Sequence, residues 1–163
     1  MNEINYKEVV EQIKSELNSE CAIANKHGVV LASLIKEFSI GKIVPHSILE
    51  LISKHHEITK ELNLKKITSF AVASEDRFYL FTFSEKLILI TKLDKKVNLT
   101  KFMPSISVFL QHIESKFVTE ELKEFTKFDF SSDIAKMKET LESEESKENK
   151  YSIIKTLIKY ISN

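Results

Sequence analysis

Apolar residues recur along the chain with two different periods, and the changes of period predict the order of helices and strands. Near the start, one stripe has helical spacing and comprises Tyr6, Val9, Val10, Ile13 and Leu17. Cys21–Ala24 and Val29–Ala32 are then short apolar runs of strand length around Asn25-Lys26-His27-Gly28. Gly28 is one of only two glycines, so we expect it to give this turn a residue with positive φ.

The middle of the chain predicts one long helix followed by three strands. Pro45 suits the first turn of the helix, and apolar residues continue at helical spacing to Leu62, a length of about five turns. Ile67–Ala73 and Arg77–Phe83 are expected strands joined by a tight turn. Leu87–Ile90 is apolar on both faces, which predicts a covered strand at the centre of the sheet.

A last core helix is expected to start near 98–101, with Thr100 as its N-cap, and to bury Phe102, Ile106, Phe109 and Ile113. The resulting order is helix–strand–strand–helix–strand–strand–strand–helix. It predicts an α/β protein of the α+β kind, with an antiparallel five-stranded sheet, helices on both faces and a helical C-terminal extension.

The composition changes after Val118, which predicts a domain over residues 1–118 and an extension over 119–163. Residues 119–138 keep helical spacing, so we expect part of this segment to pack on the domain. Residues 139–150 are acidic and poor in apolar residues, as in a solvated linker. The following amphipathic segment is too short to be stable alone, so it is expected to dock through Tyr151, Ile154, Leu157, Ile158 and Ile161.

Composition sets the outer limits of function. The 24 basic and 24 acidic residues among the 163 cancel, so bulk charge favours neither nucleic acid nor an anionic membrane as a partner. The single cysteine, Cys21, excludes an internal disulfide and suits a reducing compartment; its place in an apolar run predicts a buried, inert thiol. No secretory signal and no apolar run of about 20 residues is present, so we expect a cytoplasmic protein with at most weak or indirect membrane contact.

Motifs for catalysis or cofactor binding are absent from the sequence. It contains neither a phosphate-binding loop nor a dinucleotide-binding pattern, and Ser33 and Ser47 lack the context of a nucleophile elbow. His55 and His56 are adjacent and point about 100° apart on a helix, so they do not form the i, i+4 pair of a helical zinc site. We therefore expect surface histidines, no catalytic residue, no metal, no cofactor and no enzymatic activity.

Nucleic-acid binding is also not expected. Lys65-Lys66 and Lys95-Lys96 are isolated pairs in loops. The aromatic residues between Phe78 and Phe83 have core spacing, whereas a stacking platform needs exposed rings flanked by basic residues.

Several stretches resemble the roadblock / dynein light chain family of the prokaryotic or archaeal type. Cys21–Ser33 (CAIANKHGVVLAS) is similar to the family's opening hairpin, 67–92 to its three-strand meander, and 94–102 (DKKVNLTKF) to the start of its final helix. The resemblance covers about residues 4–118 and implies a roadblock-like αββαβββα fold. A longin domain would start directly with strands, so the helix at 6–17 argues against that relative. The loop 36–42 and the tail after Val118 depart from the minimal family domain.

The resemblance implies a non-enzymatic protein that forms a homodimer and acts as a platform for a small Ras-like GTPase or a scaffold protein. In the family, the third strand and the central helix pair across a two-fold axis. The edge expected at 67–73 agrees, because pairing protects an open edge. The implied interface comprises Ile48, Leu49, Ile52, His56, Ile67, Ser69, Ala71 and Ala73.

Two hypotheses of different classes follow. The first is a dimeric platform that binds or regulates a small GTPase. The alternative is a structural scaffold subunit that docks into a larger assembly, or onto a membrane, through its C-terminal extension. A ligand-sensing domain is less favoured, because no polar cluster marks a pocket.

Overall fold

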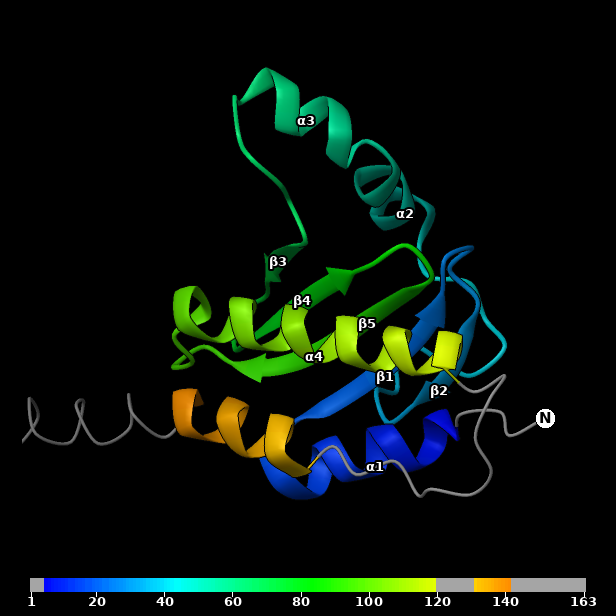
Figure 1. The fold of residues 1–163 in the computed structure, drawn as a ribbon, viewed down its shortest axis with the longest axis vertical. Helices are drawn as coiled ribbons and strands as arrows, with labels where there is room; N and C mark the ends of the chain where they lie inside the picture. The colour runs from blue at the N-terminus through cyan, green and yellow to red at the C-terminus, as the bar shows by residue number, and fades with distance from the viewer. Residues whose placement is uncertain (1–4, 120–130, 142–163) are drawn as a thin grey trace, which may run out of the picture.

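The structure, a computed structural model, describes residues 5–119 and 131–141. The elements follow in the order α1 (Tyr6–Leu17), β1 (Glu20–Asn25), β2 (Val30–Ser33), α2 (His46–Ser53), α3 (His55–Glu61), β3 (Ser69–Ala73), β4 (Arg77–Phe83), β5 (Leu87–Asp94) and α4 (Leu99–Thr119). The strands form one antiparallel five-stranded sheet in the order β2-β1-β5-β4-β3. The predicted α+β fold is therefore confirmed (Figure 1).

One face of the sheet is covered by α1 and α4. Their buried side chains, such as Val10, Ile13, Phe102 and Phe109, join inward-facing sheet residues in a single core cluster. The apolar positions that recur with helical spacing in the sequence are the side chains that α1 and α4 bury against the sheet. Leu89 of β5 lies at the centre of this layer and is fully buried.

The other face carries a second core cluster beneath the segment between β2 and α2. Ile35, Phe38 and Val44 of that segment pack with alternate residues of the strands, among them Phe81 and Ile90. β5 therefore contributes to both clusters, and the predicted central position of Leu87–Ile90 is confirmed.

The helix expected from Pro45 to Leu62 is present as two helices, α2 and α3, with Lys54 between them. Side chains compete for the backbone carbonyl groups at the break. The Ser53 hydroxyl donates to the Glu50 carbonyl at 2.8 Å, and His55 Nδ1 lies 2.6 Å from the Ile52 carbonyl. These side chains share carbonyl groups near the break, and the prediction of a single helix was wrong.

The start of α4 also differs in detail from the expectation. The side-chain oxygen of Asn98 accepts a bond from the Lys101 N–H at 3.3 Å, and the helix begins at Leu99. Asn98 is therefore the N-cap, and Thr100 lies inside the first turn.

Residues 131–141 form a further helix that packs beside α1 and α4 (Figure 1). Ile134 and Met137 are buried in the first core cluster, and Gln12 Nε2 donates to Ser131 Oγ at 3.4 Å. His112 of α4 lies 2.7 Å from Asp133 Oδ2. Part of the extension is thus integrated into the folded unit. In the described ranges, no helix has the length and apolarity that crossing a membrane requires.

Candidate interaction surface

The edge strand β3 presents unpaired backbone groups to solvent. Ser74 N–H donates to the Arg77 carbonyl at 2.8 Å, and Phe83 N–H donates to the Thr68 carbonyl at 2.9 Å. In an antiparallel ladder the hydrogen-bonded pairs alternate, so residues 70 and 72 bond to β4. The N–H and C=O groups of Ser69, Ala71 and Ala73 must then point away from the sheet.

The opposite edge of the sheet is covered by the chain itself. Val30 N–H of β2 donates to the Lys42 carbonyl at 2.9 Å, and Gly41 N–H donates to the Val30 carbonyl at 2.8 Å. Val29 and Ile43 form an antiparallel bridge. This pairing gives the loop at 36–42 a structural role, since an uncovered edge invites unwanted strand pairing. Of the two edges of the described sheet, only β3 remains open.

α2 and α3 extend away from the sheet above this open side (Figure 1). Neither helix contains a buried residue, although Ile48, Leu49 and Ile52 are half-buried against the second core cluster. Leu51 and Leu62 are exposed. A helix pair with apolar side chains on more than one face and no buried residue is typical of an element that packs against a partner.

His56, which belongs to the implied dimer interface, is exposed on α3. Its ring centroid lies 3.8 Å from that of His55, and the His55 ring meets Phe83 edge-on at 5.3 Å. His55 is half-buried through this contact, whereas His56 is exposed.

The structure brings only part of the implied interface onto one strand. Ser69, Ala71 and Ala73 lie on β3, with Ala71 and Ala73 exposed. Ile67 precedes β3 and is half-buried against the second core cluster, so the strand is shorter than the predicted 67–73. The predicted docking residues Tyr151, Ile154, Leu157, Ile158 and Ile161 lie outside the described residues.

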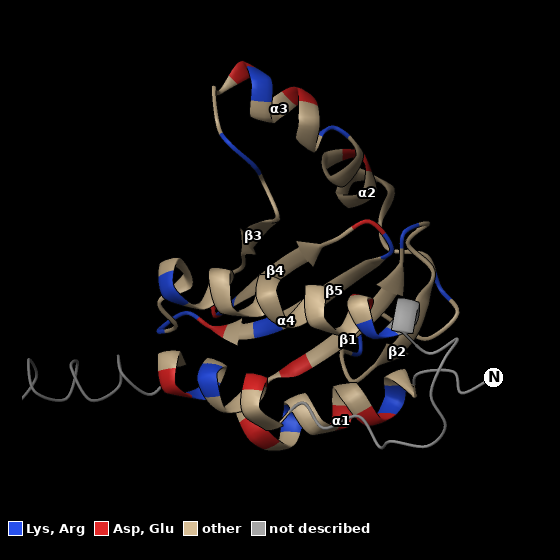
Figure 2. Cartoon of the chain, viewed as in Figure 1, with Lys and Arg blue, Asp and Glu red and all other residues tan. Residues whose placement is uncertain are grey.

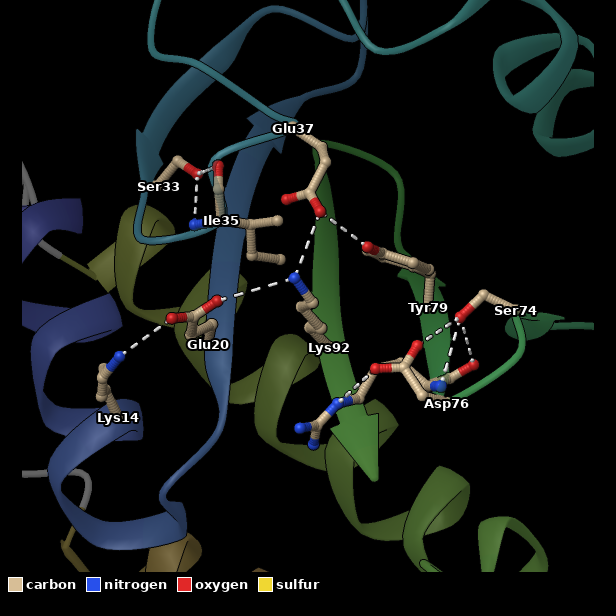
Figure 3. Close-up of polar contacts among 10 residues, drawn as sticks. Lys14, Glu20, Ser33, Ile35, Glu37, Ser74, Asp76, Tyr79 and Lys92 are labelled. Atoms are coloured by element: carbon tan, nitrogen blue, oxygen red, sulfur yellow. Dashed lines mark hydrogen bonds and ion pairs between the residues drawn. The ribbon is translucent and has the colours of Figure 1, made fainter. Parts of the chain in front are cut away.

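A polar cluster that sequence reasoning missed joins the segment after β2 to the sheet (Figure 3). Tyr79 Oη donates to Glu37 Oε1 at 2.9 Å, and Lys92 Nζ lies 3.2 Å from the same oxygen. Lys92 Nζ also lies 5.7 Å from the centre of the Tyr79 ring and 4.0 Å from Glu20 Oε2. Glu37 and Lys92 are far apart in sequence, so no spacing pattern could have revealed the pair.

Contacts within the cluster shift the pKa values of Glu37, Tyr79 and Lys92. The Glu37 backbone N–H lowers the pKa of the Glu37 carboxyl, and the bonds from Tyr79 and Lys92 lower it further. Burial raises the pKa of Tyr79, and its bond to Glu37 adds to the effect. The bond to Glu37 raises the pKa of Lys92. The Glu37 carboxylate is partly exposed, so solvent weakens these ion-pair contacts. We assign the cluster a structural role, because it links the segment after β2 to β4 and β5.

Cys21 is fully buried, as expected from its apolar run. Burial raises the pKa of its thiol to about 12, although Lys14 opposes the shift, so the reactive thiolate is strongly disfavoured. Within residues 5–119 and 131–141, no group of three or more His, Cys, Asp or Glu side chains could hold a metal ion.

Comparisons with known proteins give structural likeness only. No family model matches the chain, and no curated protein matches it. Among solved structures, MglB from Myxococcus xanthus is similar over 78% of this chain and 98% of its own, with 12% identity and a TM-score of 0.49. The gliding protein MglB from Thermus thermophilus and an MglB with tetrameric arrangement each cover 83% of this chain and 87% of their own, with 14% identity and a TM-score of 0.41. At these values the likeness assigns neither a family nor a function to the chain.

Proposed function

We propose that this chain is a non-enzymatic, homodimeric platform of the roadblock type that binds or regulates a small Ras-like GTPase. The observation that carries the dimer is the open edge of β3, where the backbone groups of Ser69, Ala71 and Ala73 point outward. The GTPase partner rests on the resemblance of 21–33, 67–92 and 94–102 to the roadblock family.

The register of the open edge defines how two copies would pair. If two β3 strands meet antiparallel about a two-fold axis, the outward groups match when Ala71 lies opposite Ala71 of the second copy. Ser69 then lies opposite Ala73, and the ladder contains about six hydrogen bonds. Small side chains at these positions allow close approach.

The same symmetry accounts for α2 and α3. A two-fold axis through the paired edges runs perpendicular to the sheet, so the helix pairs of both copies lie on one face of a continuous sheet. Apolar side chains such as Leu51, exposed in the single chain, would be covered there. No catalytic group is assigned to this chain, so any effect on GTP hydrolysis would act through the bound GTPase.

Light scattering of the full chain tests the dimer. The wild type should have twice the mass of one chain at concentrations on the order of tens of micromolar. Ala71→Pro should be monomeric, because proline removes the outward N–H while leaving the β4 side of the edge strand intact. Ala71→Ser keeps the N–H and should remain dimeric. A wild type that is monomeric under these conditions would contradict the proposal.

Binding of purified proteins tests the GTPase partner. A small GTPase recovered with the tagged chain from its native host would be purified and loaded with GDP or a non-hydrolysable GTP analogue. Calorimetry should show that the wild-type dimer binds one nucleotide state more tightly than the other. Absence of binding in both states, with the dimer intact, would reject the GTPase function and leave the dimer standing.

A further inference from the structure

The loop that covers the edge of β2 carries two isoleucines at unusually exposed positions. Ser39 C=O accepts a bond from Lys42 N–H at 3.1 Å, and Gly41 has φ 77°, as the third residue of a type II turn requires. Ile40 occupies the second position of this turn, where polar residues or proline are usual. Its side chain is 62% exposed, and that of Ile43 is 66% exposed.

Exposed lysines surround these isoleucines. Lys42 lies between them in the sequence, and the Val44 N–H bond to the Gly28 carbonyl at 2.8 Å holds the β1–β2 turn, which contains Lys26, beside the loop. Figure 2 shows basic positions of the chain in blue and acidic positions in red. No acidic residue occurs between Phe38 and Leu49. The nearby Glu37 carboxylate is engaged by Lys92 and Tyr79, and Glu85 of the β4–β5 turn is followed by Lys86.

The backbone of the loop suits an environment poor in water. The N–H groups of Gly41, Lys42 and Val44 all donate to carbonyl groups of the chain. These three internal bonds lower the number of backbone donors that would have to give up water when the loop leaves solvent. Two apolar side chains on a turn, with positive charge beside them, match a bilayer interface bearing anionic headgroups.

We propose that the loop at 39–44 docks on an anionic lipid bilayer. Ile40 and Ile43 insert at the boundary between headgroups and acyl chains, and Lys26 and Lys42 contact headgroup phosphates. Charge complementarity favours this partner, because residues 39–48 carry Lys42 and no acidic residue, and the adjoining β1–β2 turn carries Lys26. The loop lies at the β2 edge, opposite the β3 edge, so docking does not use the β3 strand that is proposed to pair in the dimer.

A single-tryptophan reporter tests insertion, since the chain contains no tryptophan. Ile40→Trp should show a blue-shifted emission when mixed with vesicles of phosphatidylcholine containing phosphatidylserine, and no shift with phosphatidylcholine alone. Val108→Trp is the matched control, because Val108 is 61% exposed on α4 and should show no shift. High salt should weaken the response by screening the lysines.

Co-sedimentation of the otherwise native chain gives an independent readout. Lys26→Glu/Lys42→Glu should reduce partitioning to phosphatidylserine vesicles at least about tenfold, and Ile40→Asp/Ile43→Asp should reduce it similarly. Val108→Asp should retain wild-type partitioning, and circular dichroism should show that all three variants are folded. The proposal is overturned if the wild type ignores anionic vesicles or if both loop variants partition like the wild type. It is equally overturned if the loop variants lose a protein partner while the wild type shows no vesicle binding.

Discussion

Gly28 in the β1–β2 turn lies directly beneath Leu49 of α2. A Cβ atom on Gly28 would lie 2.6 Å from Leu49 Cδ1, and Gly28 has φ 83°. The turn therefore supplies both a left-handed backbone conformation and the space that lets α2 approach the sheet. This contact is one of the few that fix α2, whose residues are otherwise only half-buried or exposed.

Substitution of Gly28 by alanine should destabilise the fold more than the same change at Gly41. Both residues have positive φ, which costs alanine about 1–2 kcal/mol. Gly41 has open space around it, whereas alanine at 28 also displaces Leu49, at a further cost of about 1–3 kcal/mol. Urea denaturation measures both free energies of unfolding. In a Leu49→Ala background the excess cost at Gly28 should disappear; an unchanged excess would show that the Leu49 contact is not its cause.

Ile134→Ala should show that the folded unit extends beyond the first 118 residues. Ile134 is fully buried among residues of α1 and α4, so truncation should lower the free energy of unfolding by about 2–5 kcal/mol. Val108→Ala, at an exposed position of α4, should change it by less than about 0.5 kcal/mol. If Ile134→Ala changed the free energy of unfolding as little as Val108→Ala, residues 131–141 would not unfold cooperatively with the domain.

The Glu37 cluster predicts a particular loss of stability in acid. Because folding lowers the pKa of Glu37, its contribution is complete above the ordinary pKa of 4.5 and is lost as pH falls through the lower pKa of the folded state. The melting temperature of Glu37→Gln should therefore be lower than that of the wild type at pH 7. The two values should converge as the pH falls below 4.5. A difference that stays constant between pH 7 and 3 would exclude this titration as the source.

Local patterns predicted those features that depend on burial along one element. The double-sided apolar run Leu87–Ile90 marks the central strand because each of its faces meets a different core cluster. Gly28 revealed a turn because few other residues tolerate its φ. The position of β3 at the edge followed from the resemblance and was confirmed.

Features that depend on tertiary contacts could not be predicted in this way. The break at Lys54 coincides with contacts of Ser53 and His55 to backbone carbonyl groups, which helical periodicity does not register. The bridge between Val29 and Ile43 joins an apolar loop residue to the edge of a hairpin. The bond between Glu37 and Lys92 likewise links residues that only the folded sheet brings together.

Disulfide cross-linking of Ala71→Cys tests the paired β3 edge most directly. In the proposed register the two Cα atoms at position 71 lie about 5.5 Å apart, within disulfide range. Val72→Cys is the control: it is exposed on the same strand, but its symmetry-related copies lie about 8 Å apart, beyond that range. Cys21 does not compete, because it is buried. Under mild oxidation, Ala71→Cys should form a covalent dimer and Val72→Cys should remain uncross-linked. An Ala71→Cys variant that stays monomeric, or one that cross-links no faster than Val72→Cys, would contradict the account.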